Sequence, residues 1–224
     1  MSEESNEPVK SKKVAPPKST FREYMESFVV TLIMAIFGMT FVIQAVTVPT
    51  GSMQSTILIG DYLLVNKFVF APGGKPVPLL PQKEIERGDI IVFKYPGNKV
   101  NPAGDRAHGI TAYQVNYVKR VIGLPGETVE FRGNQVYING ELLPENRLVA
   151  DDATDTTEVP TKVIDTNENA KWSVMYDADE VARGAKGGTG IVPTMSFGVA
   201  GKEMKVPEDS YFVMGDNRNN SEDS

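Results

Sequence analysis

The stretch Val48-Pro49-Thr50-Gly51-Ser52-Met53 lies where the chain changes character, between a long apolar run and the first segment with strand character. Pro49 fixes one φ angle, and Gly51 permits conformations that other residues resist. The stretch therefore predicts a bend that can hold the Ser52 hydroxyl in a defined direction. Taken alone, an isolated Gly-Ser pair is more typical of a linker, so the rest of the chain must decide between the two interpretations.

The apolar run before this bend is long enough to cross a membrane. Residues 27–60 carry no charged side chain, and residues 28–48 are almost wholly apolar. At about 1.5 Å per residue these residues span roughly 31 Å, the thickness of a bilayer core. A cleaved secretory signal has a shorter apolar region of about 7–15 residues and a small-residue cleavage site. We therefore expect a retained transmembrane helix over residues 28–48.

Basic residues are distributed unevenly around this run. Those before it are Lys10, Lys12, Lys13, Lys18 and Arg22, whereas the nearest ones after it are Lys67 and Lys75. The positive-inside bias predicts a single-pass protein with residues 1–27 as a cytosolic tail and the remaining chain outside the cytosol. The polar composition of the first twenty residues is typical of a disordered segment.

The body after the apolar run is predicted to be mainly β. Segments rich in strand-forming residues alternate with Gly- and Pro-containing turns, and none shows sustained helical periodicity. The clearest element is a hairpin of residues 128–131 and 136–138 with its turn at Arg132–Gln135, closed by Asn139-Gly140. The other predicted strands lie within residues 61–70, 86–95, 113–122 and 206–214.

Residues 141–205 differ from the strands on either side. Residues 151–180 hold nine acidic side chains against Lys162 and Lys171, which is typical of a solvated face. The glycine-rich stretch Gly187-Gly188-Thr189-Gly190 lacks the Lys-Ser/Thr ending of a phosphate loop and indicates a flexible turn. We expect a β domain formed by residues 49–140 and 206–224, with an inserted acidic subdomain over residues 141–205.

Composition excludes several kinds of chemistry. The net charge of −6 argues against nucleic acid as a partner, because phosphate binding needs a basic face. The absence of cysteine excludes disulfides, thiol catalysis and Cys-ligated metals. The single histidine, His108, lies in a predicted loop and is more typical of a surface residue than of a catalytic triad. If Ser52 is a nucleophile, its base is therefore another group.

A lysine can act as that base, because a neutral amine accepts a proton. Burial in an apolar setting can lower a lysine pKa by the roughly 3 units that this needs. Lys119 fits, since strand alternation places it on one face with Tyr117 and Val121 and places Arg120 on the other face. This separation allows one of the two cations to be buried. The alternative is a surface lysine on an edge strand.

Four stretches follow one another along the chain: Pro49–Met53 with Gly60-Asp61 and Leu64–Phe68, then Arg87–Pro96, Tyr117–Gly126 and Gly215–Ser224. In this order they resemble the catalytic boxes of bacterial type I (leader) signal peptidases. The resemblance covers residues 48–140 and 206–224 and follows a membrane anchor, which makes the combination specific.

The resemblance implies a membrane-bound serine endopeptidase with a Ser/Lys dyad on a signal-peptidase-like β fold. Ser52 would be the nucleophile and Lys119 the general base. The Ser52 backbone N–H and the Thr50 hydroxyl would form the oxyanion hole, a contribution of about 3–4 kcal/mol to the transition state. Ser221 would orient Lys119. The supporting residues would be Arg120, Asp216, Arg218 and Asp223.

The resemblance also implies the substrate and the location. Exported precursor proteins would be cut after small residues in Ala-x-Ala style at the bacterial cytoplasmic (inner) membrane, without a metal or cofactor. The partners would be these precursors and the lipid bilayer, and we expect no nucleic acid. The substrate would bind by strand addition, and the candidate wall residues are Met53, Ile57, Leu58, Tyr113 and Val115.

Two features depart from the family pattern. Ser55 stands where family members usually carry a proline, which affects the local turn. The family also continues past the position of Ser224 with an arginine paired to the last aspartate, so we expect a truncated chain in which Asp223 lacks that partner.

Two alternatives remain: the self-cleaving repressor and mutagenesis proteins, which share the dyad but are soluble, and a membrane-tethered β scaffold in which Ser52 is only a linker residue.

Overall fold

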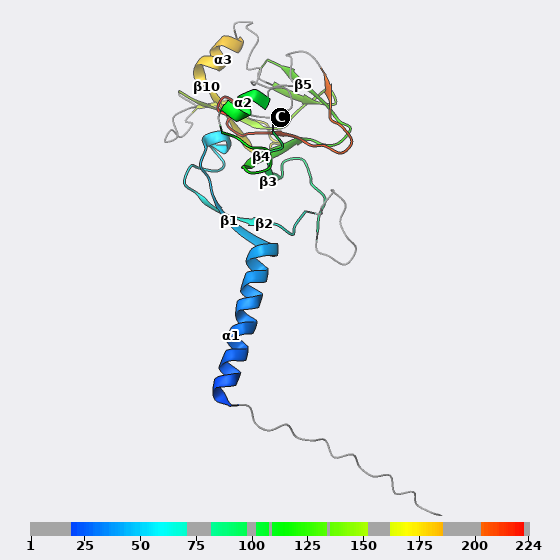
Figure 1. Cartoon of the computed structure of the whole chain (residues 1–224). Coiled ribbons are helices and arrows are strands. Elements are labelled where there is room, and N and C mark those ends of the chain that lie inside the picture. The colour runs from blue at the N-terminus through cyan, green and yellow to red at the C-terminus, as the bar shows by residue number, and fades with distance from the viewer. Residues whose placement is uncertain are drawn as a thin grey trace, which may run out of the picture. The chain divides into compact units, whose positions relative to one another are not determined.

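The computed structural model describes residues 19–70, 82–97, 102–107, 109–133, 135–151, 162–185 and 203–221 (Figure 1). The chain divides into two compact units, Met1–Ile43 and Gln44–Ser224. Three predicted features lie outside the described residues: the tail before residue 19, His108, and the stretch Gly187–Gly190. Much of the acidic run, residues 152–161, lies outside them as well.

The described part of the first unit is a single apolar helical run. Helix α1 (Thr20–Phe37) continues into the π-helical segment η1 (Gly38–Val42), and the two are together long and apolar enough to cross a membrane. None of the residues of α1 is buried against other parts of the protein. An apolar helix with all backbone groups bonded internally is the kind of segment that a bilayer accommodates, which fits a membrane anchor.

The bounds of this run differ from those predicted. The sequence places the helix over residues 28–48, whereas it begins at Thr20 and its helical geometry ends at Val42. Charged residues extend the helix at its start, where Arg22 donates to Glu26 one turn later at 3.0 Å. At its end, strand β1 (Ile43–Thr47) follows and pairs with β2 (Tyr62–Asn66). Apolar composition alone does not distinguish such a strand from the end of a helix.

The second unit is mainly β, as predicted. One three-stranded sheet of this unit consists of β3 (Ile90–Lys94), β4 (Asn116–Gly123) and β12 (Phe212–Met214), in the order β12-β4-β3. Strand β4 therefore lies at the centre, antiparallel to both neighbours. This arrangement brings the C-terminal end of the described chain next to the strand that carries Lys119.

The predicted hairpin is confirmed. Strands β5 (Thr128–Arg132) and β6 (Gln135–Ile138) pair antiparallel. The Asn139-Gly140 turn, with positive φ angles of 52° and 81°, joins β6 to its other neighbour, β7 (Glu141–Leu142). Positive φ at both central residues is the reason why Asn-Gly favours this tight turn. Strand β11 (Met204–Lys205) completes the sheet, in the order β11-β5-β6-β7.

The described part of residues 141–205 contributes another three-stranded sheet, in the order β10-β8-β9. Its strands are β8 (Asn146–Ala150), β9 (Lys162–Asp165) and β10 (Ser173–Asp177), with β10 parallel to β8. Two short helices that periodicity does not indicate are α2 (Pro102–Ala107) and α3 (Ala178–Ala185). They are too short to show a repeated helical pattern.

One apolar core joins these sheets. Ile122 of β4, Phe212 of β12 and Phe131 of β5 belong to the same buried cluster as Trp172 and Tyr176. The last two come from the region that the sequence sets apart as an inserted subdomain. A smaller cluster of Val48, Met53 and Ile57 anchors the bend that holds Ser52.

Candidate active site

The bend around Ser52 is a turn of 3₁₀ helix, η2 (Gly51–Met53), at the start of a closed loop. The loop closes because Val48 N–H donates to the Asp61 carbonyl at 3.0 Å and Gly60 N–H donates to the Val48 carbonyl at 2.9 Å. Met53 is buried beneath the turn, where its backbone carbonyl accepts a bond from the Ile57 N–H at 2.8 Å. Ser52 is half-buried on this anchored turn, which is more ordered than a linker.

Lys119 lies on the central strand β4, paired with Ile91 of β3, and not on an edge strand. Its side chain is only 3% exposed, and its amine lies 5.8 Å from the centre of the Tyr117 ring. The amine donates a hydrogen bond to the Ser221 hydroxyl, across 102 positions in the sequence. The contact between Ser221 and Lys119 that the resemblance implies is therefore present, and the orienting role of Ser221 stays a prediction.

The Ser52 carbonyl and the Ser221 side chain both lie close to Gly215. Gly215 is the first residue of segment 215–221, which is called the 215–221 loop. A Cβ built on Gly215 would overlap both the Ser52 carbonyl oxygen and the Ser221 hydroxyl, and would lie 2.6 Å from the Ser221 Cβ. The Ser52 carbonyl also accepts a hydrogen bond from the Asn217 N–H at 3.1 Å. The 215–221 loop thus brings the turn with Ser52 and the amine of Lys119 to one place.

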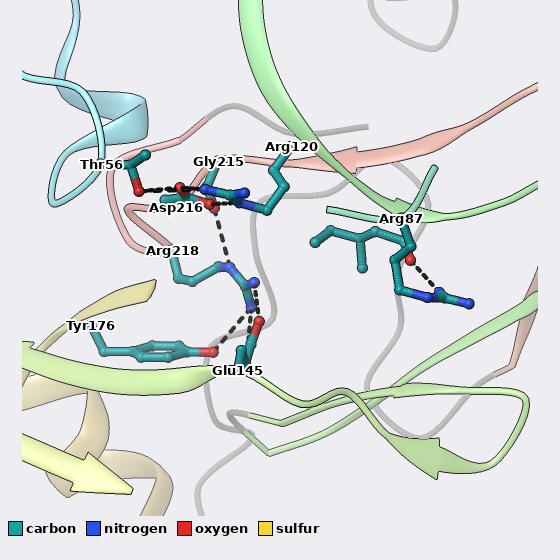
Figure 2. A network of polar contacts seen from close by, with 9 residues as sticks. Thr56, Arg87, Arg120, Glu145, Tyr176, Gly215, Asp216 and Arg218 are labelled. Atoms are coloured by element: carbon teal, nitrogen blue, oxygen red, sulfur yellow. Dashed lines mark hydrogen bonds and ion pairs between the residues drawn. The ribbon is translucent and has the colours of Figure 1, made fainter. Parts of the chain in front are cut away.

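Arg120 and Asp216 form a buried ion pair beside this point. Arg120 Nε and Nη2 donate to the two carboxylate oxygens of Asp216 at 2.8 and 2.6 Å, and the Thr56 hydroxyl donates to the same carboxylate at 2.5 Å (Figure 2). Strand alternation predicted that Lys119 and Arg120 lie on opposite faces of β4, which would allow one of them to be buried. Both are buried, because Asp216 neutralises Arg120 on its own face.

A second buried ion pair holds the other side of the 215–221 loop. Arg218 Nη1 and Nη2 donate to the Glu145 carboxylate at 3.0 and 2.5 Å, and Nη1 also donates to the Tyr176 hydroxyl at 3.2 Å (Figure 2). Burial outweighs the neighbouring Arg218 and raises the pKa of Tyr176 to about 12, so this phenol is neutral near neutral pH. Burial alone would lower the pKa of the Arg218 guanidinium, but the neighbouring groups, the Glu145 carboxylate above all, hold that pKa above its usual value.

The other predicted site residues lie as follows. Thr50 is exposed at the N-cap of η2, directly before the turn that carries Ser52. Asp223 lies outside the described residues. Of the candidate wall residues, Met53 and Ile57 are buried in the cluster under the turn, whereas Leu58, Tyr113 and Val115 are exposed by 50%, 65% and 39%. Their role in substrate binding stays a prediction.

Sequence reasoning did not single out several residues of this site: Thr56, Glu145, Trp172, Tyr176 and Gly215. Gly215 opens the last quoted box and Thr56 closely follows the first, so their place in the sequence is the one signal that could have marked them. Glu145 and Tyr176 come from the region expected to be a separate subdomain, where no local pattern marks them. Within the described ranges, no group of three or more His, Asp or Glu side chains is placed to hold a metal ion.

The arrangement of an anchored serine, a buried lysine and a hydroxyl that holds the lysine suits a serine hydrolase with a lysine base. A family model described as "Signal peptidase, peptidase S26" matches residues 21–224. The chain therefore belongs to the signal peptidase family, peptidase S26. The predicted resemblance is confirmed.

Individual relatives are similar over most of this chain. It is 33% identical to Signal peptidase I of Pseudomonas aeruginosa over 208 residues, which cover 90% of this chain and 61% of the relative. It is 31% identical to Signal peptidase I of Bacillus amyloliquefaciens over 221 residues, which cover 99% of this chain and 83% of the relative. The chain also spans 61% of the length of Signal peptidase I of Pseudomonas fluorescens.

Ser55 lies in an unfavourable backbone conformation, with φ at 80°, and its buried hydroxyl has no hydrogen-bond partner among the described residues. Because an L residue in this left-handed region costs about 1–2 kcal/mol, Ser55→Gly is expected to raise the free energy of unfolding by about 1 kcal/mol after the entropic cost of glycine. Ser55→Pro should lower it, since proline requires φ near −65°. Thermal unfolding of both variants in detergent tests this, and a stabilised Ser55→Pro protein would contradict the turn geometry.

Proposed function

We propose that this protein is a membrane-anchored serine endopeptidase that removes signal peptides from exported precursor proteins, with Ser52 as nucleophile and Lys119 as general base. Membership of the signal peptidase family supports the reaction class. The observation that carries the assignment of residues is the meeting of Ser52 and Ser221 at Gly215, with the buried Lys119 amine bonded to Ser221.

In the proposed mechanism, the neutral Lys119 amine accepts the proton of the Ser52 hydroxyl as its oxygen attacks the scissile carbonyl carbon. The Ser52 N–H and the Thr50 hydroxyl then donate to the oxyanion of the tetrahedral intermediate. The ammonium of Lys119 gives its proton to the leaving amine, which yields an acyl-enzyme and a free mature N-terminus. Lys119 next deprotonates the water that hydrolyses the ester, and Ser221 keeps the amine aimed at these atoms.

The proposed substrate is a precursor cut after an Ala-x-Ala sequence, since small residues fit shallow apolar pockets. The exposed residues Leu58, Tyr113 and Val115 remain candidates for the walls of such pockets. Met53 and Ile57 would contribute from below, as supports of the turn. Asp223 is proposed as a further supporting residue at the end of the last box.

We further propose that the enzyme lies in the bacterial cytoplasmic membrane with its N-terminus in the cytosol. The apolar run Thr20–Val42 supports the anchor, and the lysines before residue 20 support the orientation. Because Ser52 follows that run in the sequence, it would meet a precursor whose signal segment is still in the bilayer. Residues 49–140 with 206–224 would form the catalytic domain, and residues 141–205 would be an insertion in it.

The test is to incubate the full-length protein in detergent with an exported precursor and to sequence the product's N-terminus. A serine-acylating probe and peptide mapping then identify the labelled residue. We expect one cut after the Ala-x-Ala sequence, no cut when a phenylalanine replaces the second alanine, and a label on Ser52. A folded protein that neither cleaves nor takes the label would instead be a tethered scaffold, and a label on another serine would overturn the assignment of Ser52.

A further inference from the structure

The region between Glu141 and Asp177 contacts the 215–221 loop through its backbone. Strand β10 carries these contacts: Met175 N–H donates to the Asp216 carbonyl at 2.8 Å, and Arg218 N–H donates to the Met175 carbonyl at 2.9 Å. A third bond runs from the Asp177 N–H to the Asn219 side-chain oxygen at 2.8 Å. The 215–221 loop is thus bonded along one edge of a strand, although a separate subdomain was expected to contain that strand.

The same region supplies the anion that neutralises Arg218. Glu145 and Arg218 are 3% and 1% exposed at their side chains, so neither charge is solvated and each depends on the other. The remaining donor of the guanidinium, Nε, bonds to the Gly215 carbonyl at 3.1 Å (Figure 2). Glu145 therefore fixes Arg218, and Arg218 fixes the residue at which Ser52 and Ser221 meet.

Trp172, three positions before Met175, makes an independent contact with the other ion pair. The Arg120 guanidinium lies 5.2 Å from the centre of the Trp172 ring. A Cβ on Gly88 would lie 2.7 Å from that ring, so the indole is also packed closely against the turn before β3. Both buried arginines that hold the 215–221 loop are thus contacted by side chains from residues 141–177.

We propose that the described residues 141–151 and 162–177 brace the active site, and that Glu145 is a positioning residue that acts through Arg218 and Gly215 on Ser221 and so on the Lys119 amine. This inference rests on the proposed function. A loss of Glu145 leaves the buried Arg218 without its carboxylate, so the guanidinium moves to find other acceptors and releases the Gly215 carbonyl. Ser221 packs closely against Gly215, so it moves when Gly215 moves. The Lys119 amine, which is bonded to Ser221, then loses its fixed direction.

The experiment compares the full-length wild-type protein with Glu145→Gln, Glu145→Asp and Tyr176→Phe in precursor cleavage. Glu130→Gln is the matched control, since it removes a carboxylate from another arginine pair, with Arg132 on the hairpin. The readouts are kcat and KM per folded molecule and the pH profile of kcat/KM. A displaced catalytic group costs about 10²-fold in rate, so Glu145→Gln should lower kcat by about 10- to 100-fold at unchanged KM and shift the pH limb that reports the base.

Glu145→Asp should recover part of kcat, and Glu130→Gln should match the wild type. Wild-type kcat and pH profile in folded Glu145→Gln would show that Glu145 only stabilises the fold, which overturns the inference. If Glu145→Gln does not fold, the Tyr176→Phe variant decides the question, because it removes one bond to Arg218 and keeps the ion pair. A lower kcat at unchanged KM in this variant supports the inference. A wild-type kcat overturns it. An inactive wild-type protein would refute the proposed function itself, a result distinct from an active enzyme that tolerates the variants.

Discussion

Replacing Lys119 by methionine is expected to abolish precursor processing while the protein stays folded. Methionine has a similar length and tolerates a buried setting, so the packing of the 3%-exposed side chain on β4 is largely kept. What disappears is the amine that accepts the Ser52 proton. A positioned general base typically contributes about 10²–10⁴-fold to the rate, and we expect a loss of that size in kcat.

The matched control for this variant is Lys205→Met, which removes an exposed amine on β11 that pairs with Glu208. Its cleavage rate should equal that of the wild type. Ser52→Ala should have no activity above background and should no longer take a serine-acylating probe. Lys119→Met should lose that labelling too, because the nucleophile is then not activated. Cleavage near the wild-type rate by folded Lys119→Met would refute the Ser/Lys dyad.

Local sequence chemistry predicted the fold class and the members of the site that lie in short motifs. The tight turn at Asn139-Gly140, between β6 and β7, was predictable because the turn residues themselves specify it. Lys119 was predictable because strand alternation gives a lysine with apolar neighbours a buried face. Its contact with Ser221 rests on the family resemblance, since no rule of spacing joins residues 102 positions apart.

The rest of the site was not predictable because it depends on long-range packing. Residues 141–205 were expected to form a separate subdomain, and no local pattern in them marks a buried carboxylate, yet Glu145 is buried because one arginine far along the chain approaches it. The burial of both Lys119 and Arg120 likewise depends on Asp216, which strand alternation does not reveal. The end of the apolar helix at Val42 depends on the pairing of β1 with β2.

The second large effect is expected at Gly215, where Gly215→Ala should lower the cleavage rate by about 10²-fold or more, the cost of a displacement of about 1 Å in a catalytic group. The backbone at Gly215 is not in the left-handed region, so the space available decides the outcome. An added methyl group overlaps the Ser52 carbonyl on one side and the Ser221 hydroxyl on the other, and both must move apart. The lysine amine moves with Ser221.

The protein should nevertheless fold, because the ion pairs of Asp216 with Arg120 and of Arg218 with Glu145 hold the 215–221 loop on both sides. Overpacking of this kind typically costs about 1–3 kcal/mol of stability. Gly38→Ala is the matched control: Gly38 also lies outside the left-handed region, and among the described residues no neighbour lies within 4 Å of the position of its added methyl group. It should cleave precursors at the wild-type rate.

Two measurements separate a displaced site from a damaged fold in Gly215→Ala. Thermal unfolding reports the stability, and the rate of labelling by a serine-acylating probe reports the reactivity of Ser52 without the demands of a precursor. We expect a cooperative unfolding transition together with slow labelling and slow cleavage. A folded Gly215→Ala protein that labels and cleaves at the wild-type rate would show that Ser52 and Ser221 need not approach each other this closely, and the role of Ser221 in orienting Lys119 would then have to be abandoned.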